Sequence, residues 1–502
     1  MNPDPSPSPP SLPSPPAPVL TVDVAILGAG TAGMAAYRAA RAVSERVLLI
    51  EAERFGTTCA RVGCMPSKLL IAAAEAAHSA EQAHRFGVDV AGVEVDGVRV
   101  MARVRAERDR FVGFVERSAA GIPEADRMIG RAQFLDDHTL EVRSGADSDV
   151  ALRGRILARV QARSIVIATG SRPRVLPMFD GLGDRLVVND DVFNWTDLPG
   201  SVVVFGPGVI GLELGQALHR LGVRVRIFGV GGLVGPLTDP EIRENARQVF
   251  AAELALDADA HVTEVVRVAD GVQVTWDDAG TLCSETFDYV LAATGRVPNI
   301  DGLGLEQTSL QRAGPLRDRR GVPVYDPRTM QCGDSAIFLA GDANADVPLL
   351  HEAADEGRIA GENAARFPAV QPGHRTSAIA VAFTDPNIAM VGESWSQVQD
   401  RRPVVGRVSF EDQGRSRVML QNRGAMHVYA ERETGRFLGA EMVAPRAEHL
   451  AHLLAWAHQQ GLTIEQMLAM PFYHPVIEEG LRTALRDARA QLLASQPVTQ
   501  LA

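Results

Sequence analysis

Two cysteines five residues apart, Cys59 and Cys64, have the type and spacing that most directly indicate chemistry in this 502-residue chain. In a regular helix, the Cα atoms of residues five apart are about 8–9 Å apart, whereas a disulfide requires roughly 7 Å or less. A bridge between the two therefore needs an irregular start to the helix that follows. Gly63 and Pro66 are residues that can build such a start, so we predict a redox-active pair.

General cysteine chemistry offers two other interpretations of this pair. The two residues could be small buried apolar side chains or half of a zinc site. Zinc sites usually add a second pair of ligands downstream, but the remaining cysteines, Cys283 and Cys332, stand singly. The redox interpretation is therefore preferred, and no metal site is predicted.

The region before the cysteine pair carries a nucleotide-binding pattern. We predict a βαβ unit with strands over residues 19–27 and 46–51 and a helix over residues 34–43. Its first turn holds G-x-G-x-x-G at Gly28, Gly30 and Gly33, and its second strand ends in Glu51. Such glycines let the backbone approach a pyrophosphate at a helix N-terminus, and the acid can bind ribose hydroxyls.

The same pattern recurs in the middle of the chain. An apolar run over residues 201–205 leads into a second G-x-G-x-x-G, formed by Gly206, Gly208 and Gly211. A helix to residue 221 and a strand over residues 223–228 are predicted to follow. Two dinucleotide units imply two nucleotide cofactors, which is the layout of a flavoprotein that exchanges electrons with a nicotinamide.

Three further strand ends are marked by glycine. Two short apolar runs end in Ala-Thr-Gly, at Gly170 and Gly295, and each alone would be a buried strand with a glycine stop. A third run ends in Gly341-Asp342, where backbone and a carboxylate can meet a polar ligand. From about residue 377, short apolar runs between helical segments indicate an α+β module with an antiparallel sheet.

Composition and charge exclude several classes of function. The net charge of −12 at pH 7 gives no basic surface for nucleic acid or an anionic membrane. No apolar run reaches the roughly 18 residues that a membrane span needs. Four cysteines in the chain do not make the disulfide scaffold of a secreted protein. We therefore expect a cytoplasmic protein with no nucleic-acid or membrane partner.

The first 18 residues differ in composition from the rest of the chain. They are rich in proline and serine and lack the basic and apolar parts of a signal peptide. We predict a disordered, partly polyproline-II tail. A ligand for a proline-binding module is the alternative.

In this order, these motifs resemble those of the two-dinucleotide flavoprotein disulfide reductases, the family of dihydrolipoyl dehydrogenase, glutathione reductase and mercuric reductase. The resemblance runs from about residue 22 to about residue 485 and includes Phe383-Thr-Asp-Pro386 and His474-Pro-x-x-x-Glu479. The Pro-Ser-Lys that follows the second cysteine is most similar to dihydrolipoyl dehydrogenases. No cysteine follows Cys332, which argues against the mercuric reductases.

The resemblance implies a fold and a domain order. The fold is α/β, with two Rossmann-like dinucleotide-binding domains for FAD and NAD(P) followed by an α+β dimerisation domain. The implied parts are a tail over 1–18, an FAD-binding domain with the redox disulfide over 19–172, an NAD(P)-binding domain over 173–295, a central continuation of the FAD-binding part over 296–373, a dimerisation domain over 374–490 and a tail over 491–502.

The resemblance also implies roles for the site residues. Gly28, Gly30, Gly33 and Glu51 would hold the adenosine half of FAD, and Asp342 its ribityl side. The other residues assigned to cofactor binding are Gly170, Gly206, Gly208, Gly211 and Gly295. Lys68 and Glu213 would form an ion pair beside the flavin N5.

The resemblance implies four catalytic residues. Cys64 would contact the flavin, and Cys59 would exchange with substrate. His474 would be the acid–base catalyst, oriented by Glu479, since a carboxylate on one imidazole nitrogen fixes the tautomer of the ring. Without the cysteine pair, an ordinary surface histidine would be the alternative. In the family this pair acts from the other subunit, so the resemblance implies a homodimer with shared active sites.

Three departures from the family pattern matter. Thr57 stands where the family usually has a second glycine before Thr58-Cys59. Arg61 stands between the cysteines, where it either adds positive potential near the thiols or faces outward. In the second nucleotide unit, Gly229 lies 23 positions past Gly206, where an NAD enzyme would carry an acid. The loop over residues 229–235 also has no cation for a 2′-phosphate. We expect NAD, with NADP as the alternative and weaker discrimination than usual.

The predicted function is oxidation of a dithiol similar to dihydrolipoamide, with FAD passing the electrons to NAD. One alternative is an NADPH-dependent reductase of another small disulfide, similar to glutathione reductase. Another is a flavin-bearing binding or assembly protein without disulfide turnover. The resemblance also allows association with a 2-oxoacid dehydrogenase complex.

Overall fold

A computed structural model describes residues 17–145, 154–312, 318 and 320–495. The chain divides into two compact units, one formed by Met1–Phe55, Ala119–Gly170 and Pro298–His374 and the other by Gly56–Ser118, Ser171–Val297 and Arg375–Ala502. Most of the predicted N-terminal tail, residues 1–16, and the last part of the predicted C-terminal tail, residues 496–502, lie outside the described residues.

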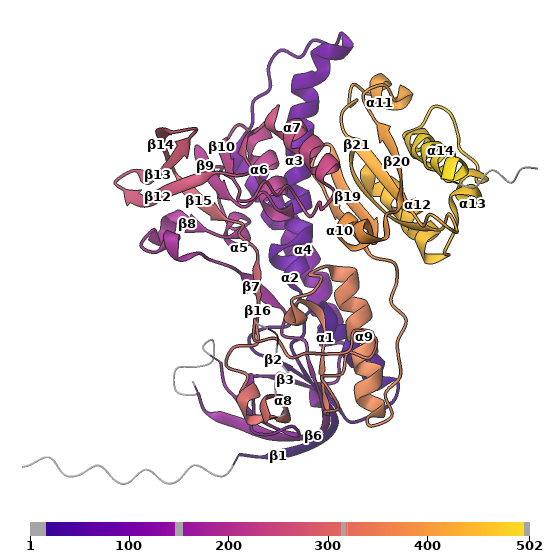
Figure 1. Cartoon of the computed structure of the whole chain (residues 1–502). Coiled ribbons are helices and arrows are strands. Elements are labelled where there is room, and N and C mark those ends of the chain that lie inside the picture. The colour runs from indigo at the N-terminus through magenta and orange to yellow at the C-terminus, as the bar shows by residue number, and fades with distance from the viewer. Residues whose placement is uncertain (1–16, 146–153, 313–317, 319, 496–502) are drawn as a thin grey trace, which may run out of the picture. The chain divides into compact units, whose positions relative to one another are not determined.

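The first unit is built on a mixed sheet with strand order β3-β2-β1-β6-β5-β4, and β17 also pairs with β6. Figure 1 labels β1, β2, β3 and β6 of this sheet. Its strands are β1 (Val19–Leu27), β2 (Val47–Glu51), β3 (Arg127–Ile129), β4 (Arg131–Phe134), β5 (Thr139–Arg143), β6 (Ile156–Ile167) and β17 (Ile337–Leu339). The strands β1, β2, β3, β6 and β17 pair in parallel. The last four residues of β1 and of β6, the first four of β2 and all of β17 are buried, as expected where both faces of a parallel sheet are covered.

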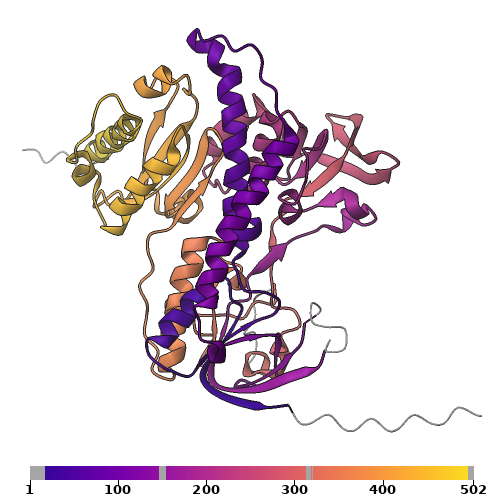
Figure 2. The ribbon, with the colours of Figure 1, turned by 180° about the vertical axis from the view of Figure 1, so that it is seen from behind.

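Two helices of the first unit, α1 (Thr31–Arg41) and α9 (Leu350–Arg366), lie side by side although they are far apart in sequence (Figures 1 and 2). Glycines at the contact allow this close approach. A Cβ on Gly357 would lie 2.2 Å from the carbonyl oxygen of Ala32, and one on Gly361 would lie 2.2 Å from that of Ala36. The predicted first βαβ unit, β1–α1–β2, is therefore present and is supported by α9.

The second unit contains another parallel sheet with strand order β11-β10-β9-β15-β8. Its elements are β8 (Leu186–Val187), β9 (Ser201–Phe205), α6 (Val209–Arg220), β10 (Arg224–Phe228), α7 (Pro240–Ala251), β11 (Ala255–Asp257) and β15 (Tyr289–Ala292). In sequence, β11 and β15 are separated by a small antiparallel sheet of β12 (His261–Val268), β13 (Gly271–Asp278) and β14 (Thr281–Phe287). The second predicted βαβ unit is β9–α6–β10.

The second unit also holds the helices that follow the first βαβ unit in sequence. These are α2 (Thr58–Val62), α3 (Cys64–Glu81) and α4 (Gly97–Ala120). Leu70 and Ile71 of α3 are buried in one apolar cluster with Leu212 of α6 and Ile227 of β10. This packing places the cysteine-bearing start of α3 in the same unit as the second nucleotide pattern.

The C-terminal part of the second unit contains an antiparallel sheet with order β18-β19-β22-β21-β20. Figure 1 labels β19, β20 and β21 of this sheet. Its elements are β18 (Ile379–Ala382), β19 (Asn387–Gly392), β20 (Val404–Ser409), β21 (Ala425–Ala430), β22 (Phe437–Ala444), α12 (Ala447–Gln459), α13 (Ile464–Leu468) and α14 (Glu478–Ser495). Apolar residues of α12 and α14, such as Leu450 and Leu485, form one buried cluster with residues of the sheet, such as Met442. This is the predicted α+β module.

The remaining short elements are β7 (Ser171–Pro173), β16 (Arg296–Pro298), α5 (Asn189–Val192), α8 (Ser309–Arg312), α10 (Trp395–Val398) and α11 (Gly414–Val418). Within the described part of the chain, none of the helices combines the length and apolar character needed to cross a membrane.

Candidate active site

The helix that carries the cysteine pair is interrupted between the two residues. α2 ends at Val62 and α3 begins at Cys64, and Gly63 between them has φ −129° and ψ −117°, far from helical values. A Cβ on Gly63 would lie 3.2 Å from the Cα of Cys59, so glycine suits the break. Pro66 lies in the first turn of α3. The predicted irregular start of the helix after the first cysteine is therefore confirmed.

Cys59 and Cys64 are free thiols, and a hydrogen bond joins them. This bond is the main reason that the pKa of Cys64 is lowered to about 7, and the positive charge of Lys68, one turn further along α3, contributes. The same bond and burial raise the pKa of Cys59. The start of α3 and the charge of Lys68 therefore favour the thiolate at Cys64 over the thiolate at Cys59. A thiolate is the reactive form of cysteine.

Lys68 forms an ion pair with Glu213 of α6. Its Nζ lies 2.8 Å from Oε2 and 3.0 Å from Oε1 of Glu213, whose side chain is only 4% exposed. The N–H of Phe383 donates to Oε1 of Glu213 at 2.8 Å. The Lys68 ammonium also lies over the Phe383 ring, 4.7 Å from its centroid, a favourable cation–π arrangement. The predicted partners Lys68 and Glu213 are thus brought together, and Phe383 contacts both.

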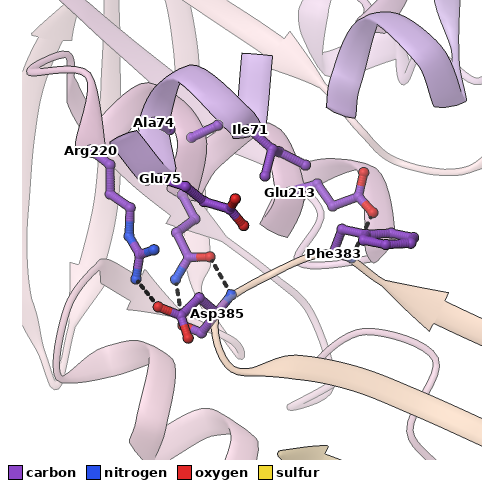
Figure 3. A pocket seen from close by; sticks show the side chains of 9 residues that line it. Ile71, Ala74, Glu75, Glu213, Arg220, Phe383 and Asp385 are labelled. Carbon is purple, nitrogen blue, oxygen red and sulfur yellow. Dashed lines mark hydrogen bonds and ion pairs between the residues drawn. The ribbon is translucent and has the colours of Figure 1, made fainter. Parts of the chain in front are cut away.

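One face of α6 holds the segment that carries Phe383 (Figure 3). Gln216 and Asp385 exchange two hydrogen bonds, of 2.8 and 2.9 Å, through the backbone of Asp385. Arg220, buried at 4% exposure, pairs with the Asp385 carboxylate at 3.0 Å and with Glu253 at 2.5 Å. Because Glu213, Gln216 and Arg220 are spaced by three and four residues, they share a helix face. Gln216 and Arg220 had no predicted role, although their spacing from Glu213 is visible in the sequence.

His474 and Glu479 form a second pair. His474 lies just before α14, and Glu479 lies in the first turn of that helix. The Nδ1 of His474 lies 2.9 Å from Oε2 of Glu479, and the His474 side chain is 80% exposed. Arg482 donates to the other carboxylate oxygen at 3.1 Å. Desolvation is the largest single influence and works against the charged form of Glu479. The hydrogen bonds from His474 and from the Val476 N–H, together with the charges of His474 and Arg482, outweigh it, and the pKa of Glu479 is lowered. Since Nδ1 is engaged, Nε2 is the nitrogen left for proton exchange.

Arg61, which stands between the cysteines, is turned toward a helix. Its Nη2 pairs with the Glu116 carboxylate of α4 at 2.7 Å, and its side chain is 19% exposed. The guanidinium is therefore largely covered rather than directed to solvent, and the Glu116 carboxylate offsets its positive charge.

The two glycine patterns build two cradles of the same construction. A Cβ on Gly33 would lie 1.8 Å from the carbonyl oxygen of Gly28, and a Cβ on Gly211 would lie 1.9 Å from that of Gly206. A Cβ on Gly30 would meet no atom within 4 Å, and the same is true of Gly208. The helices α1 and α6 begin at these open glycines without an acidic residue in their first turn. Both cradles therefore fit a pyrophosphate.

The strand ends near the first cradle carry the predicted polar groups. Oε2 of Glu51 accepts the N–H of Ala29 at 2.7 Å, which holds the carboxylate beside the glycine turn. Asp342 lies in a short 3-10 turn after β17, where the Gly341 N–H donates to Glu356 at 2.8 Å. Gly170 follows the end of β6 and has φ +70°. Its carbonyl accepts the N–H of Asn299 at 2.9 Å.

The corresponding strand end in the second unit is Gly295. It has φ +102°, and its carbonyl oxygen accepts the N–H of Arg174 at 2.9 Å. No described atom lies within 4 Å of the place where a Cβ of Gly170 or Gly295 would stand. The two Ala-Thr-Gly turns thus leave open space in the same way.

Comparison with known proteins identifies the family. Residues 22–357 match the model of the pyridine nucleotide-disulphide oxidoreductases, and residues 379–485 match the dimerisation domain of the same family. The chain belongs to the pyridine nucleotide-disulphide oxidoreductases.

Curated relatives and solved structures of this family cover nearly the whole chain. The chain is 32% identical to dihydrolipoyl dehydrogenase of Halobacterium salinarum, over 93% of this chain and 96% of that one. It is 29% identical to dihydrolipoyl dehydrogenase of Geobacillus stearothermophilus, over 92% and 94%. The structure of LpdA from Mycobacterium tuberculosis matches with a TM-score of 0.77 at 26% identity, over 94% of this chain and 99% of that one.

Membership of the family confirms four predictions from the sequence: the resemblance to dihydrolipoyl dehydrogenase, the fold class, the enzyme class and the cofactors. The chain is a flavoprotein disulphide oxidoreductase, and pyridine nucleotide-disulphide oxidoreductases use FAD and NAD(H). The two open glycine cradles fit two such dinucleotides.

Proposed function

We propose that this oxidoreductase oxidises a small dithiol similar to dihydrolipoamide and reduces NAD⁺. The observation that carries the proposal is the position of the cysteine pair, with Cys64 at the first residue of α3 and one turn before Lys68. Cys64, at the start of α3 near Lys68, has its pKa lowered to about 7, while the pKa of Cys59 is raised. A thiol of low pKa is the better leaving group in thiol–disulfide exchange. Cys64 is thus suited to leave and Cys59 to be attacked.

The proposed exchange starts from a disulfide between Cys59 and Cys64. One substrate thiolate attacks the sulfur of Cys59, the Cys59–Cys64 bond breaks, and Cys64 leaves as a thiolate. The second substrate thiolate then displaces Cys59, so the substrate leaves as a disulfide and the protein holds two reduced cysteines. Two electrons have moved from substrate to protein, and the two substrate protons are left to the acid–base group and the reduced pair.

His474 is proposed as that acid–base group, with Glu479 as its positioning residue. The Nδ1 contact of 2.9 Å leaves Nε2 to take a proton from a substrate thiol. The exposure of His474 suits a residue that acts on a second copy of the chain. We therefore propose a homodimer in which each active site combines Cys59 and Cys64 of one subunit with His474 and Glu479 of the other.

The cofactors would be held by residues at the two cradles. FAD is assigned to Gly28, Gly30, Gly33, Glu51, Gly170 and Asp342, and NAD to Gly206, Gly208, Gly211 and Gly295. When bound, FAD and NAD⁺ supply two-electron acceptor chemistry, and the electron pair leaves as NADH with release of one proton. Lys68, held by Glu213 and Phe383, would present a fixed positive charge near the flavin.

Several wider assignments belong to the same proposal. The domain boundaries are those predicted from the sequence, with the FAD-binding part over 19–172 and 296–373, the NAD-binding part over 173–295 and the dimerisation domain over 374–490. A cytoplasmic location fits the low number of cysteines. The relatives named as dihydrolipoyl dehydrogenases support association with a 2-oxoacid dehydrogenase complex.

A second candidate is an NADPH-dependent reductase of another small disulfide. Gly229 favours it, because the acid that would repel a 2′-phosphate is missing at this position. The two candidates differ in both substrate and nucleotide, so one panel of assays separates them.

The decisive experiment assays the purified FAD-loaded protein with dihydrolipoamide and with oxidised glutathione, each with NAD(H) and NADP(H). We expect turnover with dihydrolipoamide and NAD⁺. Turnover confined to glutathione disulfide and NADPH would reject the main proposal in favour of the second candidate.

The role of His474 has its own test. His474→Ala should lower dithiol oxidation about 10²–10⁴-fold, the usual contribution of a positioned acid–base group. NADH oxidation by an artificial dye should stay at the wild-type rate, since it needs no thiol proton. His449→Ala, which removes another exposed histidine of the same module, is the matched control. An equal loss in both variants would contradict the assignment.

A further inference from the structure

The end of β10 is where the second nucleotide unit should recognise the adenosine ribose. In dinucleotide-binding βαβ units, an acid about 20 residues past the first glycine binds the ribose hydroxyls and disfavours a 2′-phosphate. In this chain β10 ends at Phe228, and Gly229 follows it.

No side chain fits at position 229. A Cβ there would lie 2.6 Å from Cγ of Pro207, within the glycine turn, and 2.8 Å from the carbonyl oxygen of Ala258. The Gly229 N–H donates to the carbonyl of Asp257 at 2.7 Å, and its carbonyl accepts the N–H of Ala260 at 3.0 Å. These bonds extend the parallel pairing of β10 with β11 beyond Phe228. The end of β11 is thereby held against the ribose end of β10.

This pairing brings another carboxylate to the same place. Asp259 lies two residues past the end of β11 and is exposed. Its Oδ1 accepts the N–H of Gly231 at 2.7 Å, and Gly231 belongs to the loop that follows β10. Gly231 and Gly232 have φ of +70° and +67°, and a Cβ on either would meet no atom within 4 Å. The carboxylate therefore stands over an open stretch of loop without side chains.

The arginines of β10 do not offset this negative charge. Arg224 pairs with Glu285 of β14 at 3.2 Å, and Arg226 pairs with the same carboxylate at 3.0 Å. The Arg226 guanidinium also lies 4.6 Å from the centroid of the Trp276 ring. Both guanidinium groups are thus directed to the β13–β14 sheet, where they share the Glu285 carboxylate.

We propose that Asp259, held by the Gly231 N–H, is the residue that reads the adenosine ribose and selects NAD(H) over NADP(H). The acid has moved from the end of β10 to the end of the neighbouring strand, because Pro207 and Ala258 fill the space at position 229. This inference rests on the proposed function, since it requires a pyridine nucleotide at the second glycine cradle.

The test measures dissociation constants of NAD⁺ and NADP⁺ for the FAD-loaded protein, by titration of intrinsic fluorescence. The variants are Asp259→Asn and Asp259→Lys, with Asp270→Asn as the control that removes one exposed acid from the β12–β13 turn of the same domain. Wild type should bind NAD⁺ more tightly. Asp259→Asn should shift the ratio of the two constants toward NADP⁺ by about tenfold, because it removes the repulsion between the carboxylate and the 2′-phosphate. Asp259→Lys should shift the ratio further, because the ammonium group attracts the 2′-phosphate.

The outcomes separate the inference from the proposed function. If wild type binds NAD⁺ but the ratio is the same in Asp259→Asn, the inference is wrong and the proposed function stands. The same conclusion follows if Asp270→Asn shifts the ratio equally, because the effect would then be one of net charge. If wild type binds neither nucleotide, both are wrong.

Discussion

The two nucleotide-binding regions are alike at the glycine turn, where a pyrophosphate would bind, and differ at the strand end, where the adenosine ribose would bind. At both glycine turns, the third glycine packs on the carbonyl of the first, with 1.8 and 1.9 Å left for a Cβ at Gly33 and Gly211. At the strand ends they diverge: Glu51 binds the glycine turn of the first unit, whereas Gly229 has no room for a side chain. Only glycine allows the close backbone approach at the two turns, whereas the carboxylate for the ribose can come from a neighbouring strand.

The largest effects are expected at the third glycines, where the two regions are alike. Gly33→Ala should abolish FAD binding, because a helix must move away from its strand to admit the methyl group. Gly211→Ala should retain FAD but weaken NAD binding at least 100-fold. Flavin absorbance of the purified protein and nucleotide titration measure the two effects. Loss of FAD in Gly211→Ala would show that the regions do not act separately.

The next effect is expected where the regions differ. Gly229→Glu, which would restore the family acid, should destabilise the protein by about 1–3 kcal/mol, the usual cost of overpacking. Combining it with Pro207→Ala should recover part of this loss, since the proline ring is the nearest obstacle. Thermal unfolding of both variants measures the coupling. Full stability of Gly229→Glu alone would contradict the steric argument.

A smaller effect is expected for the acid of the first region. Glu51→Gln should weaken FAD binding about tenfold, because the neutral side chain keeps its shape but loses charge-assisted hydrogen bonding to ribose. FAD dissociation from the purified protein measures it. The unchanged NAD affinity of this variant is the internal control, and an equal loss of both cofactors would indicate general unfolding.

The smallest effect concerns the pH dependence of the cysteine pair in the second unit. A lowered pKa means that the thiolate is present at lower pH, so alkylation of reduced Cys64 should rise with a midpoint at about pH 7 rather than near 9. Lys68→Met should move the midpoint upward, because a favourable positive charge is lost. Glu51→Gln, a change in the first unit, should leave it in place. A midpoint near 9 in the wild type would contradict the assignment.

Much of this site was predictable because its motifs are local. Both βαβ units, the break in the helix at Gly63 and the α+β module follow from short-range patterns of glycine, proline and apolar residues. The approach of Phe383 to Lys68 and Glu213 was not predictable, since a backbone N–H from a segment 170 residues away has no sequence signature. The orientation of Arg61 toward Glu116 likewise depends on where α4 packs.

Residue type and spacing were enough to predict the candidate groups: a cysteine pair, two glycine cradles and a histidine with a carboxylate five residues on. These depend on residue type and local backbone geometry, which adjacent residues control. The electrostatic environment of these groups, in contrast, could not be predicted from the chain order. The hydrogen bond between the thiols, the contact of Lys68 with Glu213 and the position of Asp259 beside Gly231 all depend on how separate segments pack. Coulomb energies follow distance and burial rather than order along the chain.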